Sequence, residues 1–289
     1  MTPAGPSDAV APGRLVLVGT PIGNLGDLSP RAVEALRTAD VLAAEDTRRT
    51  RKLLSHEGIP AAGRLVAIHE HNERDAARQV VDAVREGRIV VYVSDAGMPV
   101  ISDPGERLVA ACVDAGLPIE VVPGPSAVLT ALALSGLPAG RFTFEGFLPR
   151  KGRERAERLA AIADCDCTVV MFESPHRVPA TLDDLLEVCG DERRVALARE
   201  LTKLHEETWR GTLADAALHV RAIAPRGEYV IVIGPAPVVE APIDDDAIIG
   251  ALQVELDGGA SGRDAAASVA RRFGIPKRRA YDLVISLRT

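Results

Sequence analysis

The chain has 289 residues, of which 34 are Lys or Arg and 41 are Asp or Glu, so its formal net charge is −7. Apolar residues make up 47% and charged residues 26%, a composition that excludes global disorder, and the length accommodates two compact domains. The acidic balance and an aromatic content of 3% exclude a uniformly basic nucleic-acid coat and an extended base-stacking platform, so nucleic-acid contact would need local basic patches.

Residues 1–13 are rich in Pro, Ala and Gly without periodicity, and they predict a flexible tail. The sequence has no secretory signal pattern, and its longest uncharged run, Val121–Gly140, contains three prolines and has too short an apolar core to cross a bilayer. The four cysteines have no CxxC spacing, which predicts isolated thiols in a reducing compartment. We therefore expect a cytoplasmic protein that does not contact a membrane.

An alternation of apolar runs and amphipathic stretches begins at Arg14. The first amphipathic stretch has Ser29 as its N-cap and Pro30 at the first helical position. Fully apolar strands that alternate with helices predict a mostly parallel sheet covered on both faces, in an N-terminal α/β domain over 14–137. The expected strands include 15–19, 65–68, 89–95 and 119–124, and further helices are expected at 47–57, 73–86, 106–115 and 126–134.

A second set of strands and helices follows a break near 135–140. Two of its strand runs adjoin without a helix between them, so we expect a mixed sheet in a C-terminal α/β domain over 138–236. A linker and a helical basic module then occupy 237–289, within which 265–273 and 276–286 resemble a helix–turn–helix. The expected strands are 142–147, 167–173, 194–200, 207–213 and 228–234, and the expected helices are 153–163, 181–188 and 214–222.

Three turns rich in Gly or Pro each follow a predicted strand of the first sheet. The glycines of VGTPIGNLGD (18–27) have neither the dinucleotide-binding spacing nor a following GK[ST], which leaves a tight turn that lets the backbone approach a ligand. VSDAGMPVISDPG (93–105) is a rigid loop with two carboxylates, and PGPSA (123–127) places Ser126 at a helix start. Turns without a ligand are the alternative, but we expect the three loops to converge on a ligand site at one edge of the sheet.

The motifs GTPIGNLGD, AEDTRRTRKLL, HEHNE, SDAGMPVISDPG, PGPSA, FESPHR and RELTKLHEE occur in this order between about Arg14 and Gly234. Together they resemble the tetrapyrrole methylase superfamily and, within it, the bacterial 16S rRNA cytidine 2′-O-methyltransferases. The resemblance implies two α/β domains with the active-site cleft between them, S-adenosylmethionine as cofactor and a homodimer. It also implies methyl transfer to the ribose 2′-hydroxyl of a cytidine in 16S rRNA. We expect the assembled 30S subunit as the substrate, since a structured site offers phosphates to dispersed basic patches.

The resemblance also assigns the cofactor site. Apolar contacts suit the adenine and the thioether, directed polar groups suit the ribose and the amino-acid end, and carboxylates favour the positive sulfonium. The implied cofactor-binding residues are Pro21, Asp95, Ala96, Gly97, Met98, Ser126, Ala127 and Phe172.

A ribose hydroxyl is a weak acid, so methyl transfer to it is helped by a base that accepts its proton. The loops after the second and third strands offer Glu45, Asp46 and His71 as candidate catalytic residues, with Glu45 or Asp46 favoured. His69 and His71 alternate, so at most one faces the cleft if the strand continues that far. The alternative for AEDTRR is an ordinary acidic helix start. We expect no metal, because HEHNE lacks zincin spacing and the methyl donor needs none.

Two basic clusters stand out from the acidic chain. Residues 148–158 carry a net charge of +3 and the segment from Gly258 carries +5, so the remainder carries −15. They predict contacts to RNA phosphates, with solvated helix faces or interdomain salt bridges as the alternatives. The candidate RNA-binding residues are Arg48, Arg150, Lys151, Arg177, Lys203, Arg271, Arg272, Lys277, Arg278 and Arg279.

Two other functions stay open on the sequence alone. The first is a methylase that acts on a small tetrapyrrole, against which the basic C-terminal segment argues. The second is a non-catalytic RNA-binding or assembly factor that keeps the cofactor fold, against which the intact SDAGMPVISDPG loop argues.

Overall fold

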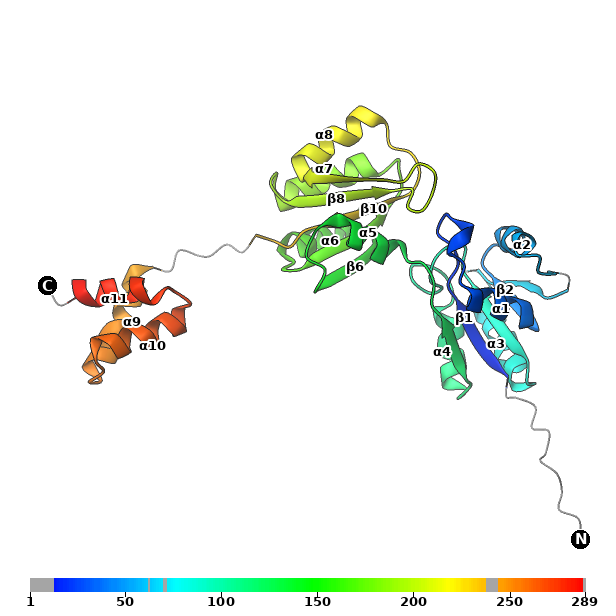
Figure 1. The fold of residues 1–289 in the computed structure, drawn as a ribbon, viewed down its shortest axis with the longest axis horizontal. Helices are drawn as coiled ribbons and strands as arrows, with labels where there is room; N and C mark the ends of the chain where they lie inside the picture. Colours follow the sequence, from blue (N-terminus) through cyan, green and yellow to red (C-terminus); the bar gives the residue numbers. More distant parts are fainter. Residues whose placement is uncertain (1–12, 62, 70–71, 238–243, 288–289) are drawn as a thin grey trace, which may run out of the picture. The chain divides into compact units, whose positions relative to one another are not determined.

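The computed structural model describes residues 13–61, 63–69, 72–237 and 244–287. The chain divides into two compact units, one ending at Ala236 and the other beginning at Pro237 (Figure 1). The expected tail over 1–12 and most of the expected linker lie outside the described residues. Within the described ranges, no helix combines the length and the apolar character that a membrane span requires.

The first sheet has five parallel strands in the order β3-β2-β4-β1-β5, as the apolar runs predict. Its buried residues alternate between two cores, one shared with α3 and α4 and the other with α1 and α2, so helices cover both faces. The strands are β1 (Arg14–Val18), β2 (Val41–Ala44), β3 (Leu65–Ala67), β4 (Ile89–Val93) and β5 (Ile119–Val122). The helices are the 3-10 turn η1 (Leu25–Asp27), α1 (Pro30–Thr38), α2 (Thr47–His56), α3 (Glu73–Arg85) and α4 (Glu106–Asp114).

The second sheet is mixed, as predicted, with the order β6-β7-β10-β8-β9. Only the β6–β7 pair is parallel, and the other pairs are antiparallel. Helices α6, α7 and α8 contribute to the core on one face. The strands are β6 (Phe142–Phe147), β7 (Thr168–Glu173), β8 (Arg194–Arg199), β9 (Glu207–Thr212) and β10 (Tyr229–Ile233), and the helices are α6 (Arg153–Asp164), α7 (Val178–Cys189) and α8 (Leu213–Ile223).

The other face of the second sheet is covered by α5 (Ala127–Ser135). Its buried residues Val128, Ala131 and Leu132 pack against β7, β8 and β10. The expected boundary after residue 137 placed this helix with the first sheet, whereas its packing joins it to the second. The uncharged sequence AVLTALALS has no polar face, so its pattern does not indicate which sheet it covers.

Two of the cysteines are not isolated, so that expectation is wrong for Cys165 and Cys167. Their Sγ atoms lie 3.2 Å apart where α6 ends and β7 begins. With Asp166 they form a group of three possible metal ligands within 4.8 Å of one another. Asp166 already accepts hydrogen bonds from both Arg141 Nη atoms, at 3.0 and 3.2 Å.

The second unit is a three-helix cluster of α9 (Asp245–Asp257), α10 (Gly262–Phe273) and α11 (Lys277–Ser286). Ile248 and Leu252 of α9 are fully buried against apolar residues of the other two helices. Gly274 ends α10 with φ of 65°, a left-handed conformation that favours glycine, and α11 starts three residues later. This arrangement agrees with the predicted helix–turn–helix.

The loops after β1 and β5 contact each other through Gly19 and Gly124, and the stability of the protein should depend on this contact. A Cβ at Gly19 would lie 2.7 Å from the Cα and N of Gly124 and 2.8 Å from Met98 Sδ. We expect Gly19→Ala to lower the free energy of unfolding by about 1–3 kcal/mol, measured by urea denaturation, because the loops must move apart. Gly140→Ala, which would meet nothing within 4 Å, is the control. Equal stability of the two variants would contradict this contact.

Candidate functional site

The loops that follow β1, β4 and β5 meet at one edge of the first sheet. Thr20 and Gly97 exchange backbone hydrogen bonds of 2.9 and 3.1 Å, and Gly19 N–H donates to Val122 O at 3.0 Å. Gly124 N–H donates a hydrogen bond to Met98 Sδ, with 3.3 Å between the nitrogen and the sulfur. The predicted convergence of the three loops is therefore confirmed, and it follows from the parallel strands, whose carboxyl ends share one edge.

A cavity of about 400 Å³ opens at this edge, a volume within the range of small-molecule sites. Its walls come from the loop after β4, the β2–α2 junction, the start of α5, and the ends of β7 and β10 that face it. The lining residues are Ile22, Glu45, Arg49, Asp95, Ala96, Gly97, Met98, Ile101, Ser102, Asp103, Ser126, Ala127, Val128, Phe147, Phe172, Glu173, Ser174, Pro175, Leu201, Glu228, Tyr229 and Val230.

The structure brings together seven of the eight cofactor-binding residues that the sequence suggests. Pro21 is the exception, and its neighbour Ile22 lines the cavity instead. Gly97 adopts φ of 79°, which favours glycine and turns the loop beneath the cavity. The seven residues on the wall are Asp95, Ala96, Gly97, Met98, Ser126, Ala127 and Phe172. Their contact with a cofactor stays a prediction.

Five of the lining residues carry a carboxylate, and two of these, Glu45 and Asp95, connect adjacent strands. Asp95 N–H donates to Glu45 Oε2 at 3.2 Å, and Asp46 N–H donates to Asp95 Oδ1 at 3.0 Å. Burial raises the pKa of Glu45, and burial likewise raises the pKa of Asp103. This acidic wall favours a cationic ligand and disfavours a phosphate.

Asp46 has a different role from Glu45, since it does not line the cavity. Its carboxylate caps α2 by accepting Arg48 N–H at 2.8 Å, and it forms an ion pair of 2.9 Å with the Arg48 side chain. The Arg48 guanidinium hydrogen-bonds it and lowers the pKa of Asp46 to about 2, so Asp46 is a weak proton acceptor. These contacts support the helix-start alternative for Asp46. The third catalytic candidate, His71, lies outside the described residues.

Arg49 is a cavity residue that the sequence reasoning missed. Its Nε lies 3.4 Å from Asp95 Oδ2, whereas the side chain of Arg48, the predicted neighbour, is 83% exposed and pairs with Asp46. The helical spacing in the sequence could have identified Arg49 as the residue that faces the cavity. Arg49 precedes the buried Leu53 by one turn, so both lie on the same side of α2.

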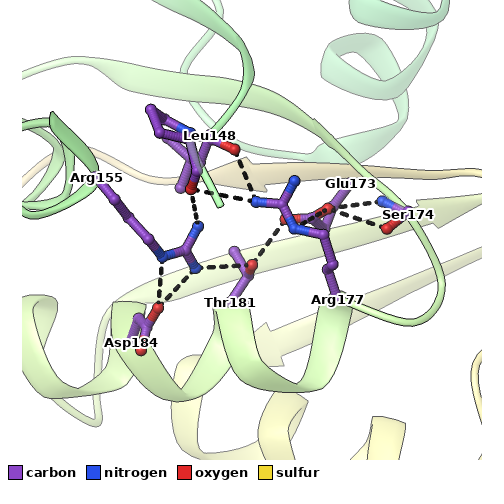
Figure 2. Close-up of polar contacts among 8 residues, drawn as sticks. Leu148, Arg155, Glu173, Ser174, Arg177, Thr181 and Asp184 are labelled. Atoms are coloured by element: carbon purple, nitrogen blue, oxygen red, sulfur yellow. Dashed lines mark hydrogen bonds and ion pairs between the residues drawn. The ribbon is translucent and has the colours of Figure 1, made fainter. Parts of the chain in front are cut away.

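The FESPHR motif forms a buried polar network rather than an open cationic site (Figure 2). The fully buried Glu173 carboxylate accepts Ser174 N–H at 2.8 Å and Thr181 Oγ1–H at 2.7 Å, and it lies 3.4 Å from Arg177 Nε. Arg177 Nη2 also donates to Leu148 O at 2.7 Å. Arg177 is thus held by partners within the C-terminal domain and not by the interdomain salt bridge given as the alternative, and its contact with RNA stays a prediction.

Lys203 is also held by acidic partners. Its Nζ lies 2.9 Å from Glu200 Oε1 and 2.7 Å from Glu228 Oε2. Both carboxylates hydrogen-bond the ammonium and raise the pKa of Lys203 against the opposing effect of burial. The ammonium therefore stabilises the loop between β8 and β9, and the contact of Lys203 with RNA stays a prediction.

The cluster over 148–158 is less basic at the surface than its composition suggests. Arg155 is buried and pairs with Asp184 at 2.6 Å, and Arg158 pairs with Glu145 at 2.6 Å. Arg150 and Lys151 are exposed, and within the described ranges neither forms an ion pair. These two residues remain as candidate phosphate contacts.

The second unit presents five exposed cations around the turn between α10 and α11. Three of them occupy the first turn of α11, where the helix dipole adds to their positive potential. Arg279 pairs with Asp245 at 2.8 Å. The five residues are Arg271, Arg272, Lys277, Arg278 and Arg279.

Comparison with known proteins defines the class of protein to which this fold and cavity belong. Residues 14–217 match the family described as Tetrapyrrole (Corrin/Porphyrin) Methylases. The chain therefore belongs to the tetrapyrrole methylase family.

Within this class, the chain is similar to proteins named ribosomal RNA small subunit methyltransferase I. The protein of this name from Mycobacterium tuberculosis strain H37Rv is 46% identical over 277 residues, which cover 96% of each chain. The one from Synechocystis is 42% identical, over 95% of this chain and 98% of that relative. The one from Thermotoga maritima is 46% identical over 221 residues, which cover 76% of this chain and 98% of that relative.

Solved structures share the fold at low sequence identity. Uroporphyrin-III C-methyltransferase from Thermus thermophilus, complexed with S-adenyl homocysteine, is 22% identical with a TM-score of 0.55, over 77% of this chain and 97% of that chain. Diphthine synthase is 14% identical with a TM-score of 0.60, over 77% of this chain and 90% of that chain. These likenesses agree with the predicted arrangement of two α/β sheets.

Proposed function

We propose that this protein transfers a methyl group from S-adenosylmethionine to RNA of the small ribosomal subunit, at the ribose 2′-oxygen of a cytidine in 16S rRNA. The cavity carries the proposal, because it places a half-buried carboxylate, Glu45, beside the predicted cofactor residues. The name of the relatives, which are 42–46% identical over nearly the whole chain, supports the RNA substrate.

The cavity suits the proposed cofactor. Met98 and Phe172 offer apolar contacts for its adenine and thioether, and Ser126 at the start of α5 offers a hydroxyl and backbone. Asp95 provides negative charge for the sulfonium. When bound, S-adenosylmethionine supplies an activated methyl group on a positively charged sulfur. A fold neighbour that is complexed with S-adenyl homocysteine supports this assignment.

Glu45 is the proposed proton acceptor for the ribose hydroxyl. Its raised pKa makes it a stronger base than an ordinary carboxylate, while Asp46 is weaker because Arg48 stabilises its charged form. The hydrogen bond from Asp95 N–H holds one Glu45 oxygen, which fixes the side chain on the cavity wall. The protein thereby aligns the hydroxyl and removes its proton.

The basic turn of the second unit is the proposed phosphate-binding element. The relative from Thermotoga maritima bears the same name although only 221 residues align. This shared name supports a proposal in which the C-terminal unit contributes RNA affinity and the first unit contributes the chemistry. The assembled 30S subunit as substrate, the homodimer and the cytoplasmic location stay predictions from the sequence.

The proposed function is tested by incubating the protein with radiolabelled S-adenosylmethionine and unmodified small subunits, free 16S rRNA or a tetrapyrrole. We expect label in 16S rRNA of the intact subunit, and mapping should locate it at the ribose of one cytidine. Label that appears only in the tetrapyrrole would overturn the proposal.

Glu45→Gln tests the proposed base. Because burial raises the pKa of Glu45, wild-type kcat should fall as the pH drops through a value above the ordinary 4.5 of glutamate. We expect the variant to lose about 10²–10⁴-fold in kcat and to lose this acid limb, with unchanged cofactor affinity. Its free energy of unfolding should not fall, since burial disfavours the ionised form.

Asp46→Asn is the matched control for this experiment. Asparagine caps a helix as well as aspartate does, so α2 should keep its start and kcat should change little. If Asp46→Asn abolished the acid limb of the kcat profile and Glu45→Gln did not, Glu45 would not be the proposed base.

The basic turn of the second unit is tested in the full chain. Replacing Arg271, Arg272, Lys277 and Arg278 together by Gln spares the Arg279–Asp245 pair. We expect weaker RNA binding and a shallower dependence of log K on log salt, by about 0.7–0.9 for each lost phosphate contact. The control removes four exposed arginines of α1 and α3, namely Arg31, Arg74, Arg78 and Arg85. Equal losses in both variants would exclude a specific role for the turn.

A further inference from the structure

We propose that Phe147 is a stacking platform for a nucleobase of the RNA substrate at the mouth of the cavity, with Arg150 and Lys151 as contacts to the neighbouring phosphates. This inference rests on the proposed function and names the nucleotide subsite of that function.

Phe147 lies at the outer end of a row of three aromatic rings. Its centroid is 5.6 Å from that of Phe172, which lies 5.0 Å from that of Phe144 in an edge-on contact. Phe144 and Phe172 are partly buried, whereas Phe147 is 53% exposed although it lines the cavity. The Phe147 ring is tilted by 55° to the Phe172 ring, so the row holds an exposed aromatic ring at the cavity wall, and base stacking requires such an exposed ring.

A local irregularity of β6 gives this ring its direction. The pairing of β6 with β7 changes register between Phe144 and Phe147, where Gly146 adopts φ of 59°. A Cβ at Gly146 would lie 3.2 Å from Ser102 Oγ of the loop after β4. The irregularity therefore brings the end of β6 against the opposite cavity wall and re-aims the following side chain.

The backbone directly after Phe147 is clamped by two arginines (Figure 2). Arg177 Nη2 donates to Leu148 O at 2.7 Å, and Arg155 Nη1 donates to Pro149 O at 2.8 Å. The Leu148 side chain is 2% exposed. The segment that joins the ring to the two cations is thus fixed before any ligand binds, which lowers the ordering cost of binding.

Acidic and hydroxyl partners hold the two guanidinium groups in turn. Arg155 contacts Asp184 at 2.6 Å and Thr181 at 3.1 Å, and Arg177 lies 3.4 Å from the buried Glu173. Thr181 joins the two halves, because its hydroxyl also donates to Glu173 at 2.7 Å. Arg155, Arg177, Thr181 and Asp184 do not line the cavity, so they position the 147–151 segment from inside the domain.

The charges of the cavity wall and of the segment after β6 determine where the phosphate and the ribose of a nucleotide can bind. Glu45, Asp95 and Asp103 on the cavity wall repel a phosphate, while the neutral ribose and base are accepted. Arg150 and Lys151 follow the clamped carbonyls directly and are exposed. A base on Phe147 with its phosphate on these cations would direct the ribose toward Glu45. Ring stacking beside cations is the general pattern of single-strand recognition.

Phe147→Leu, with Phe147→Trp as the conservative partner, tests the platform. Leucine keeps the apolar contact and removes the aromatic face, and thermal unfolding checks that each variant folds. We expect Phe147→Leu to weaken binding of a cytidine-containing single-stranded oligonucleotide about 5–150-fold and to raise KM for small subunits, with cofactor affinity unchanged. Phe147→Trp should restore both values.

Three outcomes would overturn the platform. They are wild-type protein that does not bind the oligonucleotide, RNA binding that Phe147→Leu leaves unchanged, and a loss of cofactor affinity alone, which would make the ring a cofactor contact. Label transfer by the wild-type protein is measured in parallel. Absence of transfer defeats the proposed function, whereas transfer that Phe147→Leu leaves unaffected defeats only this inference.

The two cations and the arginines that hold the backbone can be tested separately, because the cations affect the salt slope of binding and the arginines affect KM for RNA. Replacing Arg150 and Lys151 by Gln should reduce the salt slope of oligonucleotide binding by about 0.7 for each residue. Arg153→Gln is the matched control, because Arg153 is 91% exposed but pairs with Glu157 at 2.6 Å. Arg177→Lys should raise KM for RNA without changing the salt slope, since it loosens the segment but keeps the charge. An unchanged KM for RNA in that variant would contradict the clamp.

Discussion

The reciprocal hydrogen bonds between the loops after β2 and β4 are the constraint on which the site depends. Each loop gives a backbone N–H to a carboxylate of the other, from Asp95 to Glu45 and from Asp46 to Asp95. Acidic side chains on adjacent parallel strands would otherwise repel one another, and these donors offset part of that cost. The same Asp95 carboxylate also pairs with Arg49, so one residue fixes the β2 loop, the start of α2 and the cavity wall.

This arrangement separates charges in a way that suits the proposed substrate and cofactor. The carboxylates line the cavity, while Arg150 and Lys151, which are exposed and form no ion pair with a described residue, lie just beyond the end of β6. A cationic sulfur and a neutral sugar are therefore favoured inside, and phosphates are favoured outside. The net charge of −7 describes neither region, because it averages an acidic pocket with local basic surfaces.

Patterns that depend on local geometry were predictable, and those that depend on distant partners were not. Apolar runs predict the parallel sheet, and parallel strands predict that Gly19, Gly97 and Gly124 meet at one edge. The run over 148–158 does not reveal that Arg155 points inward, because its partner Asp184 lies 29 residues away. The uncharged α5 offers no polar face to indicate its sheet. Arg49 and Arg48 are chemically identical, and only the register of α2 against Leu53 separates them.

The FESPHR motif joins residues that line the cavity, Phe172–Pro175, to Arg177, which does not line it. Burying the charge of Glu173 costs free energy unless the carboxylate is paired and hydrogen-bonded. Well-packed apolar side chains of similar volume often stabilise a fold as much as a buried ion pair does. The ion pairs fix the orientation of each guanidinium group, so that its N–H donates to one particular backbone carbonyl. Here those carbonyls belong to Leu148 and Pro149, between the exposed ring of Phe147 and the exposed cations. The position of a substrate-facing segment is therefore determined from inside the domain, so the motif is specific in sequence although its arginine does not line the cavity.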